Sequence, residues 1–287
     1  MNIQNITAEH PAFPTDLKTV YQPPKSLYFR GSLDAGPCIG VVGTRKISPY
    51  GRSCVDLLVP ELVRFGQTVV SGLAYGIDAA VHHSTLDSGG KTVAVIGTGV
   101  DDDSIYPRAN LELARRIIKE GGCLMSEYPP GTPGFKNHFP ERNRIIAGLS
   151  QAVLVIEAPE KSGAMITARL ALESGRDVWA VPGPITHPNA WGPNRLIRDG
   201  ATPIANLEDL RHALGFDGAA PKQAAMKFAL TDEERGVIEL LTAEALSADQ
   251  IAKRSSRTIA AISILLTQLE LKGLIRSLGG SRFALYT

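Results

Sequence analysis

Residues 38–46 read CIGVVGTRK, a short apolar run followed by a glycine, a threonine and two cations. Similar apolar runs recur along the chain and are separated by amphipathic stretches. Strands of a parallel sheet are buried on both faces and therefore read as continuous hydrophobic runs. The pattern predicts an α/β fold with a doubly wound, mostly parallel sheet. The expected strands are 38–42, 68–70, 92–96, 123–125, 152–156 and 178–181.

Each expected strand ends in a short loop of small or polar residues. In open α/β sheets, ligands bind at the carboxyl ends of the strands, so we expect these loops to meet at one edge and form the binding site. The loops are 43–46, 71–74, 97–99, 126–127, 157–159 and 182–184.

The regions around this sheet have other patterns. Residues 1–36 contain several prolines, and we expect an extended arm that ends in a short strand and packs against the sheet domain. The sheet domain is expected to span 37–214. A linker is expected at 215–228, where the sequence GFDGAAP begins.

The C-terminal region, 229–287, has three short helical patterns followed by two short strand patterns. This order predicts a winged helix-turn-helix, with a plain three-helix domain as the alternative. The helices are expected at 232–241, 247–253 and 258–272, and the strands at 273–276 and 281–286.

The composition is that of an ordinary globular protein, with 44% hydrophobic and 21% charged residues. Lys and Arg number 30 against 29 acidic residues, so attraction for nucleic acid requires a local patch. No apolar run has the length of a membrane span and no secretion signal is visible, which favours the cytoplasm. Cys38, Cys54 and Cys123 lack CxxC spacing, so we expect neither a zinc site nor a disulfide framework.

The first strand-end loop does not have the glycines of a dinucleotide-binding loop. Gly43 is followed by Thr44, Arg45 and Lys46 rather than by the pattern G-x-G-x-x-G, and Ser71 stands where an acidic residue would bind a ribose. We therefore expect no nucleotide cofactor. Cationic side chains and backbone N–H groups suit a phosphate, with a solvated surface loop as the alternative.

A second cationic segment, FKNHFPERNR, starts at residue 135. Lys136 is interpreted as a phosphate ligand. Phe139 stands beside these cations, and such a ring either stacks on a base, as in sequence-tolerant single-strand binders, or belongs to the core.

The same segment leads into an apolar helical stretch through Arg142 and Arg144. Two arginines in a first helical turn oppose the helix dipole, so we expect them to have anionic partners. Internal carboxylates such as Glu157 and phosphates are both open as those partners.

Two further patterns are weaker. A helix expected at 163–172 begins with Ser162 and Gly163, and its free N–H groups form a generic anion site, although many such helices only need a cap. Asp78 and His82 lie at i and i+4 on one helix face without a third metal ligand. We interpret Asp78 as a helix cap and His82 as packed under the loop.

The strand-end loops match one family when they are taken in order, from about residue 14 to 210. No single motif is specific, but the ordered set resembles the DprA/Smf family. The matching residues are Gly43-Thr44-Arg45-Lys46, Tyr50-Gly51, Ser71-Gly72-Leu73-Ala74, Gly76-Ile77-Asp78, His82, Tyr106-Pro107, Ser126-Glu127, Phe139-Pro140, Arg142-Asn143-Arg144, Ser162-Gly163, Thr167, Pro182-Gly183 and Gly192.

This resemblance implies an extended Rossmann-like fold that forms a homodimer, binds single-stranded DNA and helps load a RecA-type recombinase in natural transformation and recombination. The C-terminal region is similar to the winged-helix domain of many members. Tyr75 stands where many members have arginine, which removes a phosphate contact or exchanges it for stacking. The expected DNA-binding residues are Gly43, Thr44, Arg45, Lys46, Ser71, Gly72, Lys136, Phe139, Arg142, Asn143, Ser162, Gly163 and Thr167.

Two other functions stay open. Related Rossmann-like phosphoribohydrolases use the motif P-G-G-x-G-T-x-x-E, but Leu170 replaces its glutamate here, which leaves no obvious acid for glycosidic cleavage. With no G-x-S-x-G, HExxH or P-loop motif either, we do not expect an enzyme. A winged-helix transcriptional regulator is the other alternative, although the third helix offers only Arg257 early and Lys272 late for base contacts.

Overall fold

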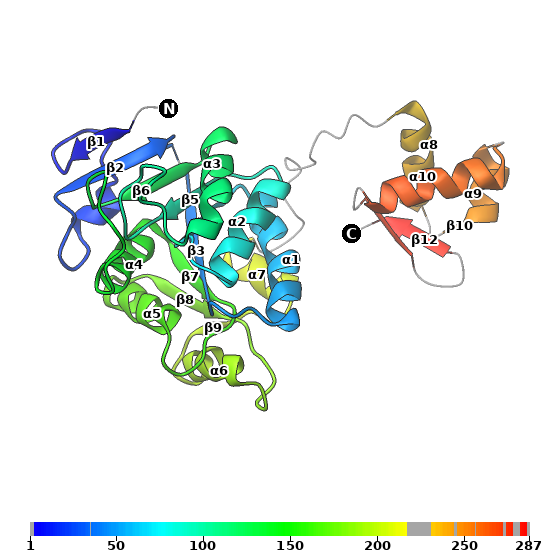
Figure 1. Ribbon diagram of the computed structural model, residues 1–287. Coiled ribbons are helices and arrows are strands. Elements are labelled where there is room, and N and C mark those ends of the chain that lie inside the picture. Colours follow the sequence, from blue (N-terminus) through cyan, green and yellow to red (C-terminus); the bar gives the residue numbers. More distant parts are fainter. Residues whose placement is uncertain are drawn as a thin grey trace. The chain divides into compact units, whose positions relative to one another are not determined.

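The structure is a computed structural model that describes residues 3–34, 36–216, 231–243, 246–255, 257–271, 274–277 and 282–285. Contacts divide the chain into two compact units, Met1–Ala224 and Ala225–Thr287 (Figure 1). Most of the expected linker, from residue 217 onward, lies outside the described residues.

The first unit is built on a nine-stranded sheet with the order β1-β2-β6-β5-β4-β3-β7-β8-β9. In this order, from β6 to β9, neighbouring strands are parallel. Strand β2 pairs antiparallel with both of its neighbours, β6 and β1. The predicted α/β fold with a mostly parallel sheet is confirmed. The strands are β1 (Gln4–Thr7), β2 (Ser26–Gly31), β3 (Cys38–Val42), β4 (Thr68–Ser71), β5 (Thr92–Val95), β6 (Cys123–Ser126), β7 (Ala152–Val155), β8 (Asp177–Ala180) and β9 (Thr202–Pro203).

Helices cover both faces of this sheet (Figure 1). Successive residues of β3 point to opposite faces, as the pleat requires: Val41 packs with one set of helices and Val42 with the other. The first set is α1 (Pro49–Arg64), α2 (Ile77–Asp87), α3 (Leu111–Lys119) and α7 (Leu207–Ala213), and the second is α4 (His138–Leu149), α5 (Gly163–Glu173) and α6 (Trp191–Arg198). Short 3-10 helices span Thr15–Lys18, Arg108–Asn110 and Pro188–Ala190.

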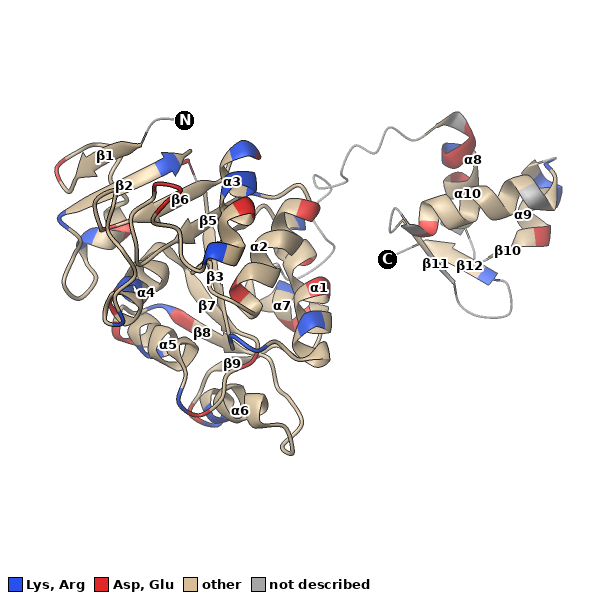
Figure 2. Ribbon diagram, viewed as in Figure 1, with Lys and Arg blue, Asp and Glu red and all other residues tan. Residues whose placement is uncertain are grey.

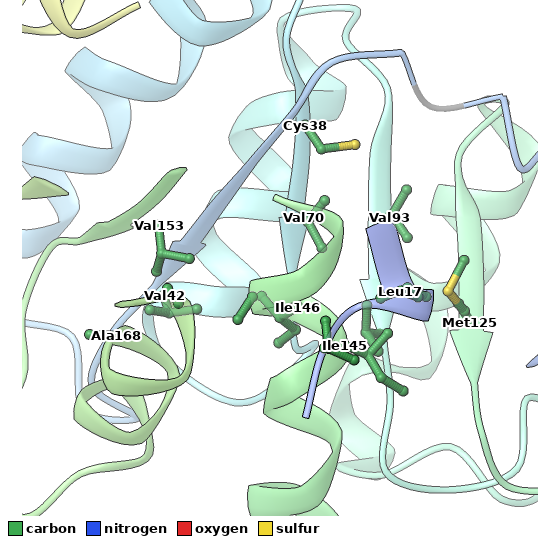
Figure 3. Close-up of a cluster of buried hydrophobic side chains, with 14 of the residues drawn as sticks. Leu17, Cys38, Val42, Val70, Val93, Met125, Ile145, Ile146, Val153 and Ala168 are labelled. Atoms are coloured by element: carbon green, nitrogen blue, oxygen red, sulfur yellow. The ribbon is translucent and has the colours of Figure 1, made fainter. Parts of the chain in front are cut away.

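The N-terminal segment is more than the expected arm, because two of its strands extend the sheet. The predicted strand is β2, which pairs antiparallel with β6, and β1 pairs in turn with β2. Between them, Leu17 joins the core cluster that also holds Ile145 and Ile146 of α4 (Figure 3). Gly148 of α4 allows this approach, because a Cβ atom there would lie 2.4 Å from Val20 Cγ1.

The second unit has the three helices and two C-terminal strands predicted for a winged helix, with an additional short strand between the first and second helices. Its sheet has the strand order β10-β12-β11, and Ile251, Ile262 and Leu266 belong to a separate core. A capping box starts the first helix: Thr231 N donates to Glu234 Oε2 at 3.0 Å and Glu234 N donates to Thr231 Oγ1 at 3.2 Å. The elements are α8 (Asp232–Ala243), β10 (Leu246–Ser247), α9 (Ala248–Ser255), α10 (Ile259–Leu271), β11 (Ile275–Ser277) and β12 (Arg282–Leu285).

Candidate functional site

The loops at the carboxyl ends of the central strands converge, as predicted. Strand β3 lies between β4 and β7, so its loop sits where the strand order reverses, the usual ligand position in such sheets. Thr44 N donates to Glu157 O after β7 at 2.6 Å, and Ile77 N donates to Thr44 O at 3.0 Å. Gly43 is required for this packing, since a Cβ atom there would lie 2.5 Å from Ile77 Cγ1.

Glu157 anchors the far end of the β3 loop. Its carboxylate is buried and accepts hydrogen bonds from Ser48 N at 3.1 Å and from Ser48 Oγ at 2.5 Å. Ser48 caps α1 by accepting from Gly51 N at 3.1 Å. Glu157 therefore fixes the start of α1. It is not the partner of Arg142, although the sequence had left it open as one.

Arg45 and Lys46 are exposed on the β3 loop. The guanidinium carbon of Arg45 lies 6.0 Å from the centroid of the Phe139 ring. Lys136 is also exposed, three residues before Phe139 in the chain. Elsewhere in the unit, basic residues are interspersed with acidic ones (Figure 2). Among the described residues, neither Arg45 nor Lys136 takes part in an ion pair, so both charges are available to a ligand.

Arg142 lies beneath these loops and has internal partners. It is 5% exposed, and its guanidinium donates to Gly72 O at 2.8 Å and to Val95 O. Burial lowers the pKa of Arg142 to about 10, which leaves it protonated at neutral pH. A Cβ atom on Gly72 would lie 2.5 Å from Arg142 Nη2 and 2.7 Å from Asp78 Oδ2, so a glycine is needed for this contact.

Asp78 is the acidic neighbour of Arg142 and does not cap its own helix, contrary to our expectation. Gly76 occupies the cap position of α2, and Asp78 Oδ2 accepts from Gly72 N at 3.2 Å. Burial raises the pKa of Asp78, although Arg142 counteracts that effect. The carboxylate thus holds the β4 loop. His82 is packed as predicted, with Nδ1 2.7 Å from Thr92 Oγ1, and burial lowers its pKa to about 3.

Arg144 also pairs inside the protein, with a carboxylate that the sequence pattern did not identify. Its Nη2 donates to both oxygens of Glu127, at 2.7 and 2.8 Å. We expected Arg142 and Arg144 in the first turn of the helix. Because α4 begins at His138, they stand in its second turn instead. Both arginines therefore have internal partners, although Arg144 Nη1 is buried without a hydrogen-bond partner among the described residues.

The start of α5 lies next to α4. Asn143 Nδ2 donates to Gly163 O at 3.3 Å, and the buried Thr167 Oγ1 donates to the same oxygen at 3.1 Å. Ser162 caps the helix by accepting from Met165 N at 3.4 Å. An open depression of about 500 Å³ lies here, lined by Glu160, Lys161, Ser162, Gly163, Met165, Ile166 and Arg169. Its N–H groups and Lys161 suit an anion, whereas Glu160 opposes one and Arg169 is paired with Glu173 at 3.5 Å.

Phe139 is half-buried, so its ring is neither fully in the core nor fully open to a ligand. Cβ atoms on Gly97 and Gly134 would lie 3.2 and 3.1 Å from its ring, so part of the ring is covered by the protein. The Tyr106 ring also lies near it, with 5.7 Å between centroids. Tyr106 belongs to the residues that match the family in sequence, but it was not among the expected DNA-binding residues.

The described residues include no helix that is long and apolar enough to cross a membrane. Nor do they include a group of three His, Cys, Asp or Glu side chains that could hold a metal ion.

The structure divides the expected DNA-binding residues into an exposed set around Arg45 and a buried set around Arg142.

Two solved structures have the same architecture as the first unit. DNA processing protein A from Streptococcus pneumoniae is 41% identical, with a TM-score of 0.69 over 73% of this chain and 74% of the other. DNA processing protein A from Helicobacter pylori is 30% identical, with a TM-score of 0.66 over 75% of this chain and 98% of the other.

Sequence comparisons extend over most of the chain. It is 46% identical to the DNA processing protein DprA of Bacillus subtilis over 211 residues, which are 72% of this chain and 70% of the other. It is 37% identical to Protein Smf of Escherichia coli over 284 residues, 96% of this chain and 75% of the other. Family models match at residues 4–215, as DNA recombination-mediator protein A, and at 220–281, as the DprA winged helix domain. The chain therefore belongs to the DprA/Smf family of DNA recombination-mediator proteins.

Proposed function

We propose that this protein binds single-stranded DNA at the carboxyl edge of its sheet, without enzymatic turnover, and assists the loading of a RecA-type recombinase in natural transformation and recombination. The observation that carries the binding proposal is the exposed Arg45 beside the half-buried Phe139. Cations that follow a nucleic-acid backbone, next to rings that accept bases, are the combination used by sequence-tolerant single-strand binders. The single-stranded DNA binding mode of the Helicobacter pylori relative supports the proposal.

The two sets of site residues have different roles in this proposal. Exposed Arg45, Lys46 and Lys136 bind phosphates, and the N–H groups near Ser162 and Gly163 donate hydrogen bonds to a further phosphate. The other members build the site: Gly43, Thr44, Ser71, Gly72, Arg142, Asn143 and Thr167 hold the loops and helix starts that carry the contacts.

The recombinase partner, the homodimer and the cytoplasmic location rest on family membership. An enzymatic role is disfavoured because Leu170, at the position of the phosphoribohydrolase glutamate, offers no acid. A role as a sequence-reading regulator is disfavoured because Arg257, which lies two residues before α10, is already paired with Glu233 at 2.7 Å.

A titration of the purified protein with fluorescent oligonucleotides tests the binding proposal. Mixed-sequence single strands of increasing length should bind more tightly than the matching duplexes, with little dependence on sequence. With three to five phosphates bound, log affinity should fall against log salt with a slope of about −2 to −3.5 per protomer. A marked preference for one duplex sequence would favour the regulator, and a slope near zero would reject the cationic loops as the site.

A further inference from the structure

The Tyr106 ring is more open to a ligand than the Phe139 ring beside it. Tyr106 is 52% exposed, and the two ring planes are inclined by 45°. Phe139 is partly covered by the backbone around Gly97 and Gly134, and Arg45 lies close to its ring. A base that approaches this pair thus meets the Tyr106 ring more readily.

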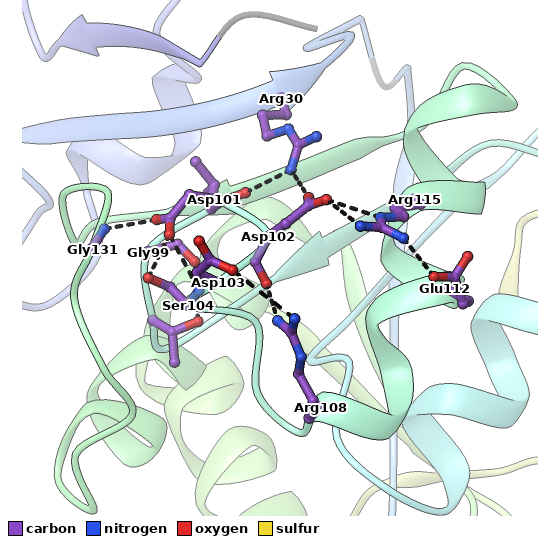
Figure 4. A network of polar contacts seen from close by, with 12 residues as sticks. Arg30, Gly99, Asp101, Asp102, Asp103, Ser104, Arg108, Glu112, Arg115 and Gly131 are labelled. Atoms are coloured by element: carbon purple, nitrogen blue, oxygen red, sulfur yellow. Dashed lines mark hydrogen bonds and ion pairs between the residues drawn. The ribbon is translucent and has the colours of Figure 1, made fainter.

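A network of charged residues fixes the loop that carries Tyr106 (Figure 4). Asp101 accepts from Ser104 Oγ at 2.8 Å and from Gly131 N at 2.7 Å, which ties this loop to the segment that precedes Lys136. A ring on a loop that is already held loses little conformational freedom when a ligand binds.

Asp102 ties the same loop to β2 and α3. It accepts from Arg30 Nη1 at 2.5 Å and from Arg115 Nε at 2.9 Å. These hydrogen bonds, the one from Arg30 first, hold the pKa of Asp102 below its usual range. Its charge is balanced by two arginines, so the carboxylate repels a nearby nucleic-acid strand less than a bare carboxylate would.

We propose that Tyr106 is a second ring of the DNA site, on which one base of the bound single strand stacks. Asp101 and Asp102 are positioning residues that act through the loop. The strand's phosphates then face Arg45 and Lys136, and its bases face the two rings. This inference rests on the proposed single-strand binding.

Photocrosslinking of the unmodified protein tests the contact directly. Single strands that carry 5-iododeoxyuridine are irradiated in complex with the full chain, and the tryptic peptides are analysed by mass spectrometry. Cleavage after Lys91 and Arg108 places Tyr106 on peptide 92–108, whereas Phe139 lies on peptide 137–142. We expect crosslinks at Tyr106. Crosslinks confined to other peptides would overturn the inference.

Affinity measurements test whether the contact is made to a base. Tyr106→Ala should weaken binding by about 5-fold or more, the lower end of what one stacked base contributes, with an unchanged salt slope. Tyr106→Trp should retain parent affinity. On a strand of abasic sites, parent and Tyr106→Ala should bind equally, because no base is present. An equal loss on normal and abasic strands would contradict stacking.

The matched control is Tyr21→Ala, which removes a tyrosine that is 70% exposed in the N-terminal segment. Thermal unfolding confirms that each variant is folded. If the parent protein binds no single strands, the proposed function itself fails. If Arg45→Glu loses binding while Tyr106→Ala binds like the parent, only the stacking inference fails.

Discussion

Reversing the charge of Arg45 gives the sharpest test of the DNA site. Two unit charges at about 4 Å interact by about 1 kcal/mol in water. Arg45→Glu replaces that attraction with a repulsion of similar size, which is about 2 kcal/mol, or about a 30-fold loss of affinity at low salt. Arg45→Gln removes only the attraction, so we expect about a 5-fold loss and a salt slope that is smaller by about 0.7.

Fluorescence anisotropy with a mixed-sequence single strand at several salt concentrations measures both quantities. Arg45 is exposed and unpaired among the described residues, so its variants should unfold at the parent temperature. Lys119→Glu is the matched control, because this exposed lysine ends α3, at the opposite edge of the sheet. If folded Arg45→Glu binds like the parent, the reasoning is refuted, and the binding surface must be sought around Arg254, Arg257, Arg276 and Arg282 of the second unit.

Further predictions concern the rest of the site. Lys136→Glu should weaken binding as Arg45→Glu does and should reduce the salt slope, and an unchanged slope would remove Lys136 from the site. Phe139→Ala should cost about 1 to 3 kcal/mol of binding at a constant slope if the ring stacks, whereas loss of thermal stability instead would assign it to the core. Arg142→Met should lower the free energy of unfolding by about 3 to 5 kcal/mol, because Gly72 O and Val95 O lose their donor and the buried Asp78 loses a nearby positive charge. Tryptophan fluorescence in urea follows the unfolding, and a loss below about 1 kcal/mol would contradict this structural role. Chelators should leave DNA binding intact, and release of free base from a nucleoside monophosphate would reveal an enzyme.

Local patterns predicted most of the sheet and the edge at which the loops meet. Buried parallel strands such as β3 and β7 have an uninterrupted apolar signal, so their positions could be predicted. The strand β1 has one buried residue among four, and β9 has only two residues, so neither stands out from a loop.

The partners inside the site could not be predicted in the same way. Arg144 is bound by Glu127, which lies 17 residues away, and Arg142 bonds to Gly72, 70 residues away. Such pairs depend on the order of strands in the sheet, which local periodicity does not specify. Local sequence patterns could therefore predict that cations lie near the carboxyl edge of the sheet. They could not predict that Arg45 is exposed there whereas Arg142 is buried.

The two outermost strands have a consequence for the behaviour of the protein at high concentration. An open sheet presents unpaired N–H and C=O groups at both margins, where another chain can add a strand and start aggregation. At one margin, β9 is two residues long and Pro203 has no N–H to donate. At the other, β1 spans four residues, three of which are exposed. Both margins are thus poor templates, which keeps so wide a sheet from recruiting further strands.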